Sequence, residues 1–412
     1  MKEISGGVCA PKGFLAGGIR CGIKPSSQKK DLALIYSLKI CSAAAMFTEN
    51  KVKAASVLVS QENISHGKIR AVIANSGNAN ACTGEEGMIA AKRMVKLAAD
   101  VLLIDPAEVA VASTGVIGVP LPINVIEKNI DILKTSLRDD EQGHNDALEA
   151  IMTTDTHKKD IAVEIEIGGK PVRIGAMTKG SGMIHPNMAA VKHATMLTFI
   201  TTDAAVLPSA LDSALRAAVK HSFNRLTVDG DTSTNDMVLV MANGEAGNAP
   251  ITMESADYEV FRAAIEKVCI VLTRMMARDG EGATKLVTVT VNGASCEDTA
   301  EALAKSIASS SLVKTACFGA DANWGRILCA MGYAGVDFIP EKTAVKFKST
   351  IGEIEVCRDG QTVNFSEEKA KEILTQEEIE IIVNLQEGNG TVSVWGCDLT
   401  YDYVKINGDY RS

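Results

Sequence analysis

Thr195 stands in a setting where its hydroxyl could act as a nucleophile. It lies in the stretch NMAAVKHATMLTFITTDA, which runs from Asn187 to Ala204, and it directly follows the small residue Ala194. An internal threonine can attack the preceding carbonyl in an N-to-O acyl shift, and hydrolysis of the ester leaves a new N-terminal threonine. Its freed α-amine, with a pKa of about 7.7–8.0, can then accept the hydroxyl proton. Ala194–Thr195 is therefore a candidate self-cleavage site.

The same residues also suit a β-strand. Thr195 opens a run of apolar and β-branched residues, and β-branched side chains are enriched in strands. The residue types alone leave both interpretations open.

Other common catalytic patterns are missing from the sequence. It contains no H-E-x-x-H, no Walker loop and no G-x-G-x-x-G after an expected strand. The stretch KGSGM (179–183) has Lys179 where a nucleophile elbow needs glycine, so Ser181 is a poor serine-hydrolase candidate. The ten cysteines and six histidines show no zinc-ligand spacing. We expect no metal site, cysteines that are reduced and mostly buried, and histidines at the surface.

The composition indicates which class of protein this is and which kinds of partner it can bind. The 412 residues are 46% hydrophobic and 23% charged, which is typical of a globular protein, and the length allows two or three lobes. A net charge of -9 without a Lys or Arg cluster argues against nucleic acid and favours small-molecule partners. The N-terminus has no apolar signal segment, and no apolar run approaches the ~18–20 residues of a membrane span. We expect a cytoplasmic protein.

Hydrophobic periodicity predicts the elements that must position Thr195. Strands are expected over 69–77, 108–114, 161–169, 172–180, 195–204, 236–244, 285–293, 379–385 and 391–406. Helices are expected from a Thr83/Glu86 capping box onward and over 209–222, 255–277, 298–309 and 366–374. QEGNG (386–390) is a plausible hairpin turn between the last two strands. The elements do not alternate regularly, which favours an α+β fold over a doubly wound sheet. The loop 223–236 suits either turns or a polar site wall.

Motifs along the whole chain carry a family resemblance. TKGSGMIHPNMA and ATMLTFITTDA resemble the signature of the ornithine acetyltransferase (glutamate N-acetyltransferase) family of arginine biosynthesis. Further matching stretches occur in family order: GGVCAPKGF, FTENKVKAASV, NSGNANACTGEEG, STGVIG, IMTTDT, RDGEGATK, GADANWGRI and WGCDLTYDYVKINGDYRS. The presence of all these stretches in the same order is highly specific for this family.

The resemblance implies a role for individual residues. Thr195 is then the self-cleavage residue and acyl-carrying nucleophile, and the chain matures into an α fragment, 1–194, and a β fragment, 195–412. Thr114 and Gly115 match the oxyanion hole. The substrate-contacting positions match Thr153, Lys179, Thr195, Glu281, Asn407 and Ser412. Lys179 can pair with the substrate α-carboxylate and Glu281 with an ammonium group.

Each of these residues also has an ordinary interpretation. Thr114 and Gly115 could simply end a strand. Lys179 and Glu281 could be solvated surface charges, and Asn407 and Ser412 could belong to a frayed tail.

The sequence departs from the family pattern at one place. Five residues, AVKHA (190–194), stand between Ala189 and Thr195, where the family pattern runs from Pro-Asn-Met-Ala straight into Thr-Met-Leu. The scissile bond is then Ala194–Thr195. The extra length could bulge harmlessly, or it could disturb the geometry of cleavage.

The resemblance implies a fold and an activity. The expected fold is a layered αββα sandwich like that of self-processing N-terminal-nucleophile-like enzymes, including L-aminopeptidase D-esterases. The expected reaction is ping-pong transfer of acetyl from N2-acetylornithine to glutamate, with no cofactor, by an assembly of two α and two β fragments. Acetyl-CoA is a further candidate donor. The alternatives are a self-processing aminopeptidase or amidohydrolase and an uncleaved amino-acid-binding protein.

Overall fold

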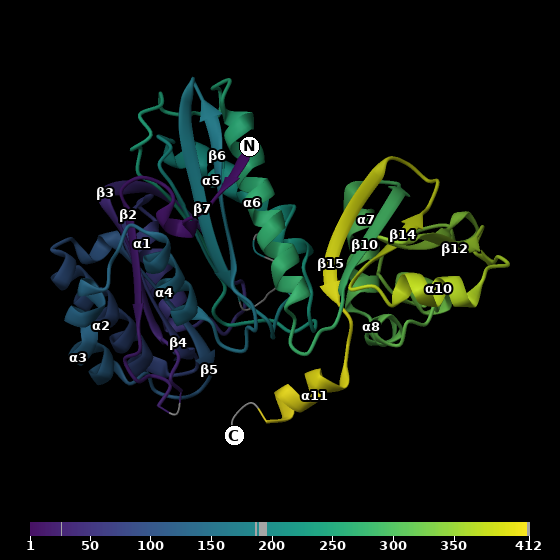
Figure 1. The fold of residues 1–412 in the computed structure, drawn as a ribbon, viewed down its shortest axis with the longest axis horizontal. Coiled ribbons are helices and arrows are strands. Elements are labelled where there is room, and N and C mark those ends of the chain that lie inside the picture. The colour runs from purple at the N-terminus through teal and green to yellow at the C-terminus, as the bar shows by residue number, and fades with distance from the viewer. Residues whose placement is uncertain (26, 186–187, 189–195, 410–412) are drawn as a thin grey trace. The chain divides into compact units, whose positions relative to one another are not determined.

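The chain folds into two compact units. The computed structural model describes residues 1–25, 27–185, 188 and 196–409. Unit 1 comprises Met1–Asn224 and Asp231–Leu272, and unit 2 comprises Arg225–Gly230 and Thr273–Ser412. Each unit has its own sheet and its own hydrophobic core (Figure 1).

Unit 1 is built on nine strands. They are β1 (Lys2–Ile4), β2 (Phe14–Ile19), β3 (Leu32–Phe47), β4 (Lys68–Asn78), β5 (Val109–Val116), β6 (Lys159–Ile167), β7 (Lys170–Lys179), β8 (Leu197–Thr202) and β9 (Met237–Ala242). Their order is β1-β6-β7-β8-β9-β3-β4-β5, and β2 also pairs with β3. Strands β7 and β8, which come before and after the predicted cut, are hydrogen-bonded antiparallel neighbours.

The long strand β3 divides these strands into two packed layers. Residues 32–37 pair with β2, residues 32–36 and 41–42 pair with β4, and residues 42–47 pair with β9. The register shifts between Tyr36 and Cys41, as expected where a strand bends from one sheet into another. Side chains of both layers share one core, which contains Ile35, Val72, Ala112, Met177, Phe199 and Leu239.

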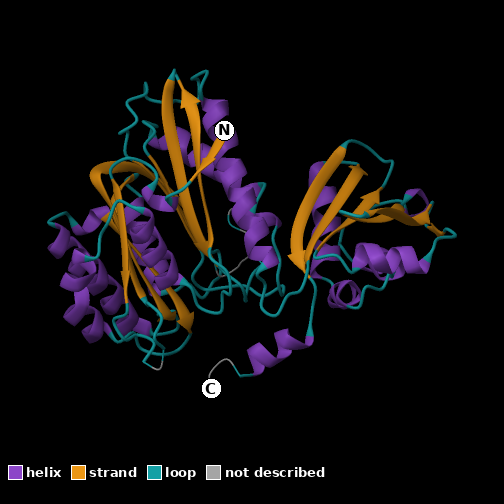
Figure 2. Ribbon diagram, in the orientation of Figure 1, coloured by secondary structure: helices purple, strands orange, loops and turns teal. Residues whose placement is uncertain are grey.

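Helices pack against the strands of unit 1. They are α1 (Ala55–Ile64), α2 (Gly84–Leu102), α3 (Ile123–Thr135), α4 (Glu141–Ile151), α5 (Pro208–Lys220) and α6 (Tyr258–Arg278), of which α6 belongs to unit 1 as far as Leu272. A second core joins Met94 of α2 and Ile126 of α3 to Leu34, Ile73 and Val111 on the strands. Figures 1 and 2 show α2 and α3 on one side of the strands and α5 and α6 on the other. The predicted layered α+β sandwich is therefore confirmed.

Unit 2 is a six-stranded sheet covered by helices. Its strands are β10 (Leu286–Ala294), β11 (Ala344–Ser349), β12 (Gly352–Arg358), β13 (Gln361–Thr362), β14 (Glu378–Asn384) and β15 (Gly390–Cys397), in the order β13-β12-β11-β14-β10-β15. Its helices are α7 (Glu297–Ser309), α8 (Ser311–Phe318), α9 (Trp324–Gly332), α10 (Glu367–Leu374) and α11 (Tyr401–Gly408).

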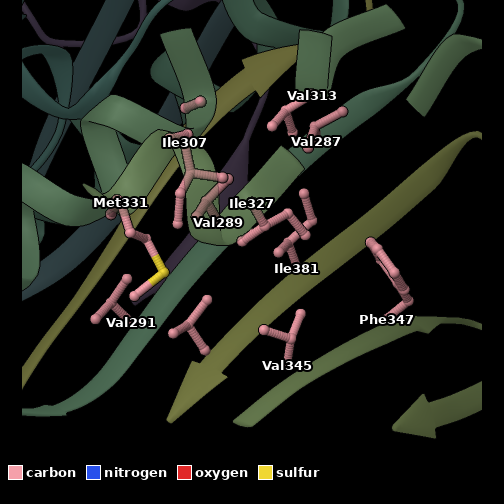
Figure 3. Packing of buried hydrophobic residues seen from close by; sticks show 14 of the residues in the cluster. Val287, Val289, Val291, Ile307, Val313, Ile327, Met331, Val345, Phe347 and Ile381 are labelled. Atoms are coloured by element: carbon pink, nitrogen blue, oxygen red, sulfur yellow. The ribbon is translucent and has the colours of Figure 1, made fainter. Parts of the chain in front are cut away.

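The core of unit 2 follows from the alternation of side chains along its strands. Val287, Val289 and Val291 of β10 point to one face and pack with Ile307 of α7 and Ile381 of β14 (Figure 3). The intervening residues of β10 are polar. Because successive side chains of a strand point to opposite faces, the apolar face is buried and the other carries polar contacts.

Three sequence-based predictions about local structure are wrong. The expected hairpin is not formed, because β14 and β15 both pair with β10 and lie on either side of it. The strand expected over 391–406 ends at Cys397, and α11 follows, with Thr400 capping its N-terminus. Thr83 precedes α2, but its side chain donates to Asn80 Oδ1 at 2.9 Å instead of accepting a cap hydrogen bond from the helix.

Most other expected strands and helices are present within one to three residues of their predicted bounds. All ten cysteines are free thiols, and seven are buried, as expected. His144 contradicts the surface expectation, since it is buried and its Nδ1 accepts a hydrogen bond from Val8 N–H at 3.3 Å. Among the described helices, none is both long and apolar enough to cross a bilayer.

Candidate active site

The predicted oxyanion-hole residues lie where β5 ends beside β4. Thr114 is buried, and Gly115 has a φ of +134°, in a region that favours glycine. A Cβ on Gly115 would lie 2.3 Å from the carbonyl carbon of Gly77 on the neighbouring strand. The β4–β5 register is irregular here, because Asn78 pairs with both Thr114 and Val116. Thr114 and Gly115 do end a strand. In addition, the close approach of Gly115 to Gly77 and its positive φ require glycine at position 115.

Lys179, at the end of β7, points its ammonium group at Thr114. Lys179 Nζ donates to Thr114 Oγ1 over 3.3 Å, and the Lys179 side chain is only 3% exposed. It is therefore no solvated surface charge. An ammonium group only donates hydrogen bonds, so Thr114 must be the acceptor and keeps its own hydroxyl hydrogen. No described residue accepts a hydrogen bond from that hydroxyl, which can therefore serve a ligand.

Asp155 joins the Thr153 loop to the end of β7. Its carboxylate accepts hydrogen bonds from Thr153 N–H at 2.9 Å and Gly180 N–H at 2.8 Å, and it pairs with Lys159 Nζ at 2.7 Å. Burial by itself would raise the pKa of Asp155, but the charges of Lys179 and Lys159 hold this pKa below its usual range. The buried carboxylate thus stays ionised and fixes Thr153 relative to Lys179.

Asn235 and Asp236 connect the oxyanion strand to the strand that follows the predicted cut. Asn235 Nδ2 donates to Ser113 O at 2.7 Å and to Ala79 O at 2.6 Å. The Asp236 carboxylate accepts a hydrogen bond from Met196 N–H. Two adjacent side chains therefore hold Ser113, next to Thr114, and Met196, next to Thr195. In the loop 223–236, these two polar side chains bind backbone groups of neighbouring segments.

Ala194, Thr195 and Ser412 lie outside the described residues, as does the segment 190–194. Both described neighbours of the predicted cleavage segment are anchored in unit 1. Met188 N–H donates to Asn224 Oδ1 at 2.6 Å, and Met196 N–H donates to Asp236. Both acceptors come from the ends of the loop 223–236.

Glu281 and Asn407 form a group of their own in unit 2. Asn407 Nδ2 donates to Glu281 Oε2 over 2.8 Å, and Glu281 is 7% exposed. Thr400, which caps α11, donates its hydroxyl hydrogen to Gly282 O at 2.7 Å. The structure therefore ties the helix that carries Asn407 to the loop that carries Glu281. Glu281 is not a solvated surface charge, and Asn407 lies in a regular helix.

Lys24, which the sequence did not predict as a site residue, lies against β4, the strand that pairs with the oxyanion strand. Its Nζ donates to Met152 O, directly before Thr153, at 2.8 Å. Its side chain passes Gly77 so closely that a Cβ there would lie 2.5 Å from Lys24 Cγ. Burial lowers the pKa of Lys24 to about 8, and the charge of Lys179 acts in the same direction.

The residues that the sequence analysis missed are supporting residues: Lys24, Asp155, Lys159, Asn224, Asn235 and Asp236. An Asx turn could not have signalled Asp155, because in such a turn the carboxylate accepts the N–H two residues after it, whereas Asp155 accepts that of Thr153, two residues before it. For Lys24 no local signal existed. Within the described ranges, no three His, Cys, Asp or Glu side chains gather into a set that could hold a metal ion.

Comparison with known proteins shows the family to which this chain belongs. The family model described as "ArgJ family" matches residues 15–412. The chain belongs to the ArgJ family. The "Arginine biosynthesis bifunctional protein ArgJ" of Caldanaerobacter subterraneus subsp. tengcongensis is 50% identical over 412 residues, with 100% of each chain covered. The protein of that name from Bacillus subtilis is 47% identical, with 100% of this chain and 98% of the relative covered.

A solved ArgJ structure is also similar. The crystal structure of the arginine biosynthesis bifunctional protein ArgJ from Bacillus halodurans matches with a TM-score of 0.50 and 49% identity. The match covers 52% of this chain and 99% of that chain. Membership of the ArgJ family confirms the predicted resemblance, and the chain is an acyltransferase.

Proposed function

We propose that this ArgJ-family chain transfers acetyl from N2-acetylornithine to glutamate in arginine biosynthesis, through an acetyl ester on Thr195. The relatives' shared name and the family match over residues 15–412 support this proposal. The observation that carries it is the hydrogen bond to Thr114 of the predicted oxyanion hole from Lys179, whose strand β7 pairs with the strand that follows Thr195.

Thr195 is activated by cleavage of the Ala194–Thr195 bond. The chain matched in Bacillus halodurans supports this step, because 99% of it corresponds to only 52% of this chain. Residues 195–412 are likewise a little over half of the sequence. The fragments 1–194 and 195–412 would remain associated, since residues 174–179 of β7 pair with the whole of β8.

In the first half-reaction, Thr195 Oγ attacks the acetyl carbonyl and its proton passes to the freed α-amine. The Thr114 hydroxyl and the Gly115 N–H stabilise the developing oxyanion, the C–N bond breaks, and the proton goes to the departing amine of ornithine. In the second half-reaction, the glutamate α-amine attacks the acetyl ester. The C–O bond to Thr195 breaks and Oγ regains a proton, giving N-acetylglutamate.

The charged residues suit these amino-acid substrates. Lys179 is a buried cation at the oxyanion strand, and it can pair with a substrate α-carboxylate. Glu281 is a buried carboxylate with Asn407 as its hydrogen-bond donor, and we assign it to the ammonium group of ornithine. The proposed chemistry requires neither a metal nor an organic cofactor.

Mass analysis under denaturing conditions tests the proposed cleavage. We expect two fragments in place of one 43.5 kDa chain, and one intact chain for Thr195→Ala. Two fragments from Thr195→Ala would show that another bond is cut. A single wild-type species with full acetyl transfer would contradict the mechanism.

Product analysis tests the transfer. Incubation with N2-acetylornithine and glutamate should give N-acetylglutamate and ornithine in equal amounts. Free acetate as the main product would support the hydrolase alternative. The relatives' bifunctional name supports acetyl-CoA as a second donor, which is tested by glutamate-dependent thiol release. Native mass measurement tests the proposed assembly of two α and two β fragments.

A further inference from the structure

Lys24 is a half-buried cation without an acidic partner among the described residues. Its ammonium group donates to Met152 O at 2.8 Å and more weakly to Lys30 O at 3.5 Å. The nearby carboxylate of Asp31 instead accepts three backbone N–H groups, those of Cys21, Gly22 and Lys24 itself. An ammonium group has three N–H donors, so Lys24 can still donate to a ligand.

The position of Lys24 places this cation at the candidate active site. Its side chain lies against Gly77, and Gly77 is paired with Gly115 of the predicted oxyanion hole. The carbonyl that it contacts belongs to Met152, whose neighbour Thr153 is a predicted substrate-contacting residue. Lys24 and Lys179 are therefore two cations near one short stretch of β5.

Two cations match the charge difference between the two amino-acid substrates. N2-acetylornithine carries one carboxylate, whereas glutamate carries an α-carboxylate and a side-chain carboxylate. Lys179 suffices for the α-carboxylate that both share, but the second carboxylate of glutamate needs another cation. We propose that Lys24 binds the side-chain carboxylate of the acceptor glutamate and so makes the enzyme prefer glutamate as the acceptor. This proposal rests on the proposed function.

The electrostatic surroundings of Lys24 favour such a ligand. Burial lowers the pKa of Lys24 to about 8; Lys179 and Lys29 also lower this pKa, whereas Asp31 and Asp155 raise it. A bound carboxylate would favour the charged form and offset the cost of burial. Contact with Met152 O at the end of α4 also helps to hold a cation here, because a helix C-terminus carries a partial negative charge.

A comparison of glutamate with its two amides tests the proposal. Glutamine lacks the side-chain carboxylate, and isoglutamine lacks the α-carboxylate. Lys24→Met should reduce the preference for glutamate over glutamine in kcat/KM by roughly 10- to 100-fold, the typical weight of a charged hydrogen bond. The preference over isoglutamine should stay within about threefold of wild type, as should single-turnover release of ornithine from N2-acetylornithine.

Matched variants separate binding from a purely structural effect. Lys24→Arg keeps the charge and should retain most of the preference. Lys29→Met removes an exposed lysine nearby and should change neither preference. If the substitution only disturbed the end of α4 or the folding of the chain, turnover with glutamate and with glutamine would fall equally. Lys24→Gln provides a second neutral variant if Lys24→Met does not fold.

Three results would overturn the assignment. They are an unchanged glutamate-over-glutamine preference in both neutral variants, an equal loss of turnover with all acceptors, and a selective loss of the preference over isoglutamine, which would place the α-carboxylate at Lys24. If wild type forms no N-acetylglutamate, the proposed function is wrong. In that case, the affinities of wild type and Lys24→Met for glutamate and glutamine, measured by calorimetry, still decide whether Lys24 binds the side-chain carboxylate.

Discussion

The carboxylate of Asp236 accepts a hydrogen bond from the backbone N–H of Met196, the residue that follows the predicted nucleophile. Asp236 is fully buried directly before β9, and β9 runs parallel to β8. The neighbouring Asn235 binds Ser113 O on the oxyanion strand. This arrangement fixes the start of β8 relative to β5 through two adjacent side chains.

Removal of the Asp236 anchor should therefore impair both cleavage and transfer. We expect Asp236→Ala to slow self-cleavage and acetyl transfer by about 10- to 100-fold, because a misplacement of roughly 1 Å at a reacting group can cost that much. Asp236→Asn retains a carbonyl acceptor and should lose less. Fragment formation over time and steady-state transfer provide the measurements; wild-type rates in Asp236→Ala would contradict the anchoring role.

A side chain at position 115 should destabilise the oxyanion strand. Gly115→Ala would place a Cβ 2.3 Å from the carbonyl carbon of Gly77 at a φ of +134°. We expect the free energy of unfolding to fall by about 1–3 kcal/mol, with a large loss of activity. Gly118→Ala is the matched control, because Gly118 also has a positive φ but no heavy atom lies within 4 Å of an added Cβ. Equal unfolding midpoints for the two variants in denaturant would contradict this argument.

The Thr114 hydroxyl should act mainly on the chemical step. Thr114→Val keeps the shape of the side chain but removes the donor, and we expect kcat to fall by about 10²–10³-fold. Thr114→Ser restores a hydroxyl and should recover much of the rate. Single-turnover acetylation from N2-acetylornithine is the appropriate measurement. A change confined to KM would argue that Thr114 contributes to substrate binding instead.

Asp155 should make the stability of the protein depend on acidic pH. Its pKa is lowered in the folded state, so its contribution is present above the unfolded-state pKa of about 3.9 and is lost as pH falls toward the folded-state value. Asp155→Asn should destabilise the fold at neutral pH by about 3–5 kcal/mol, since it leaves Lys159 beside a neutral group. In Asp155→Asn, the free energy of unfolding should also decrease less steeply than in wild type as the pH falls into the acidic range.

The exposed Asp100, which pairs with Lys96 on the surface of α2, provides the control for Asp155. Asp100→Asn should change stability by no more than about 1 kcal/mol. Denaturant unfolding between pH 3 and pH 7 compares the two variants; an acid limb of equal slope in Asp155→Asn and wild type would show that Asp155 is not the group responsible.

Local sequence patterns were sufficient where an element's own residues decide its structure. The alternating apolar residues of β10 and the amphipathic α5 and α7 follow from side-chain periodicity, and the structure has them close to the predicted bounds. The motifs that identify the family are likewise contiguous stretches. The sequence alone therefore determined the α+β class, the family and the candidate residues around STGVIG.

Only the tertiary structure decided how those elements pair and which side chains meet. QEGNG has the composition of a hairpin turn, yet β10 takes the position between β14 and β15, and such a choice depends on residues about a hundred positions away. Lys24, Asp155 and Asp236 belong to separate segments that lie beside β5, β7 and β8 only after the sheets assemble. Periodicity describes which face a residue takes on its own element, whereas strand pairing and buried charge networks depend on long-range packing, which no short stretch of sequence encodes.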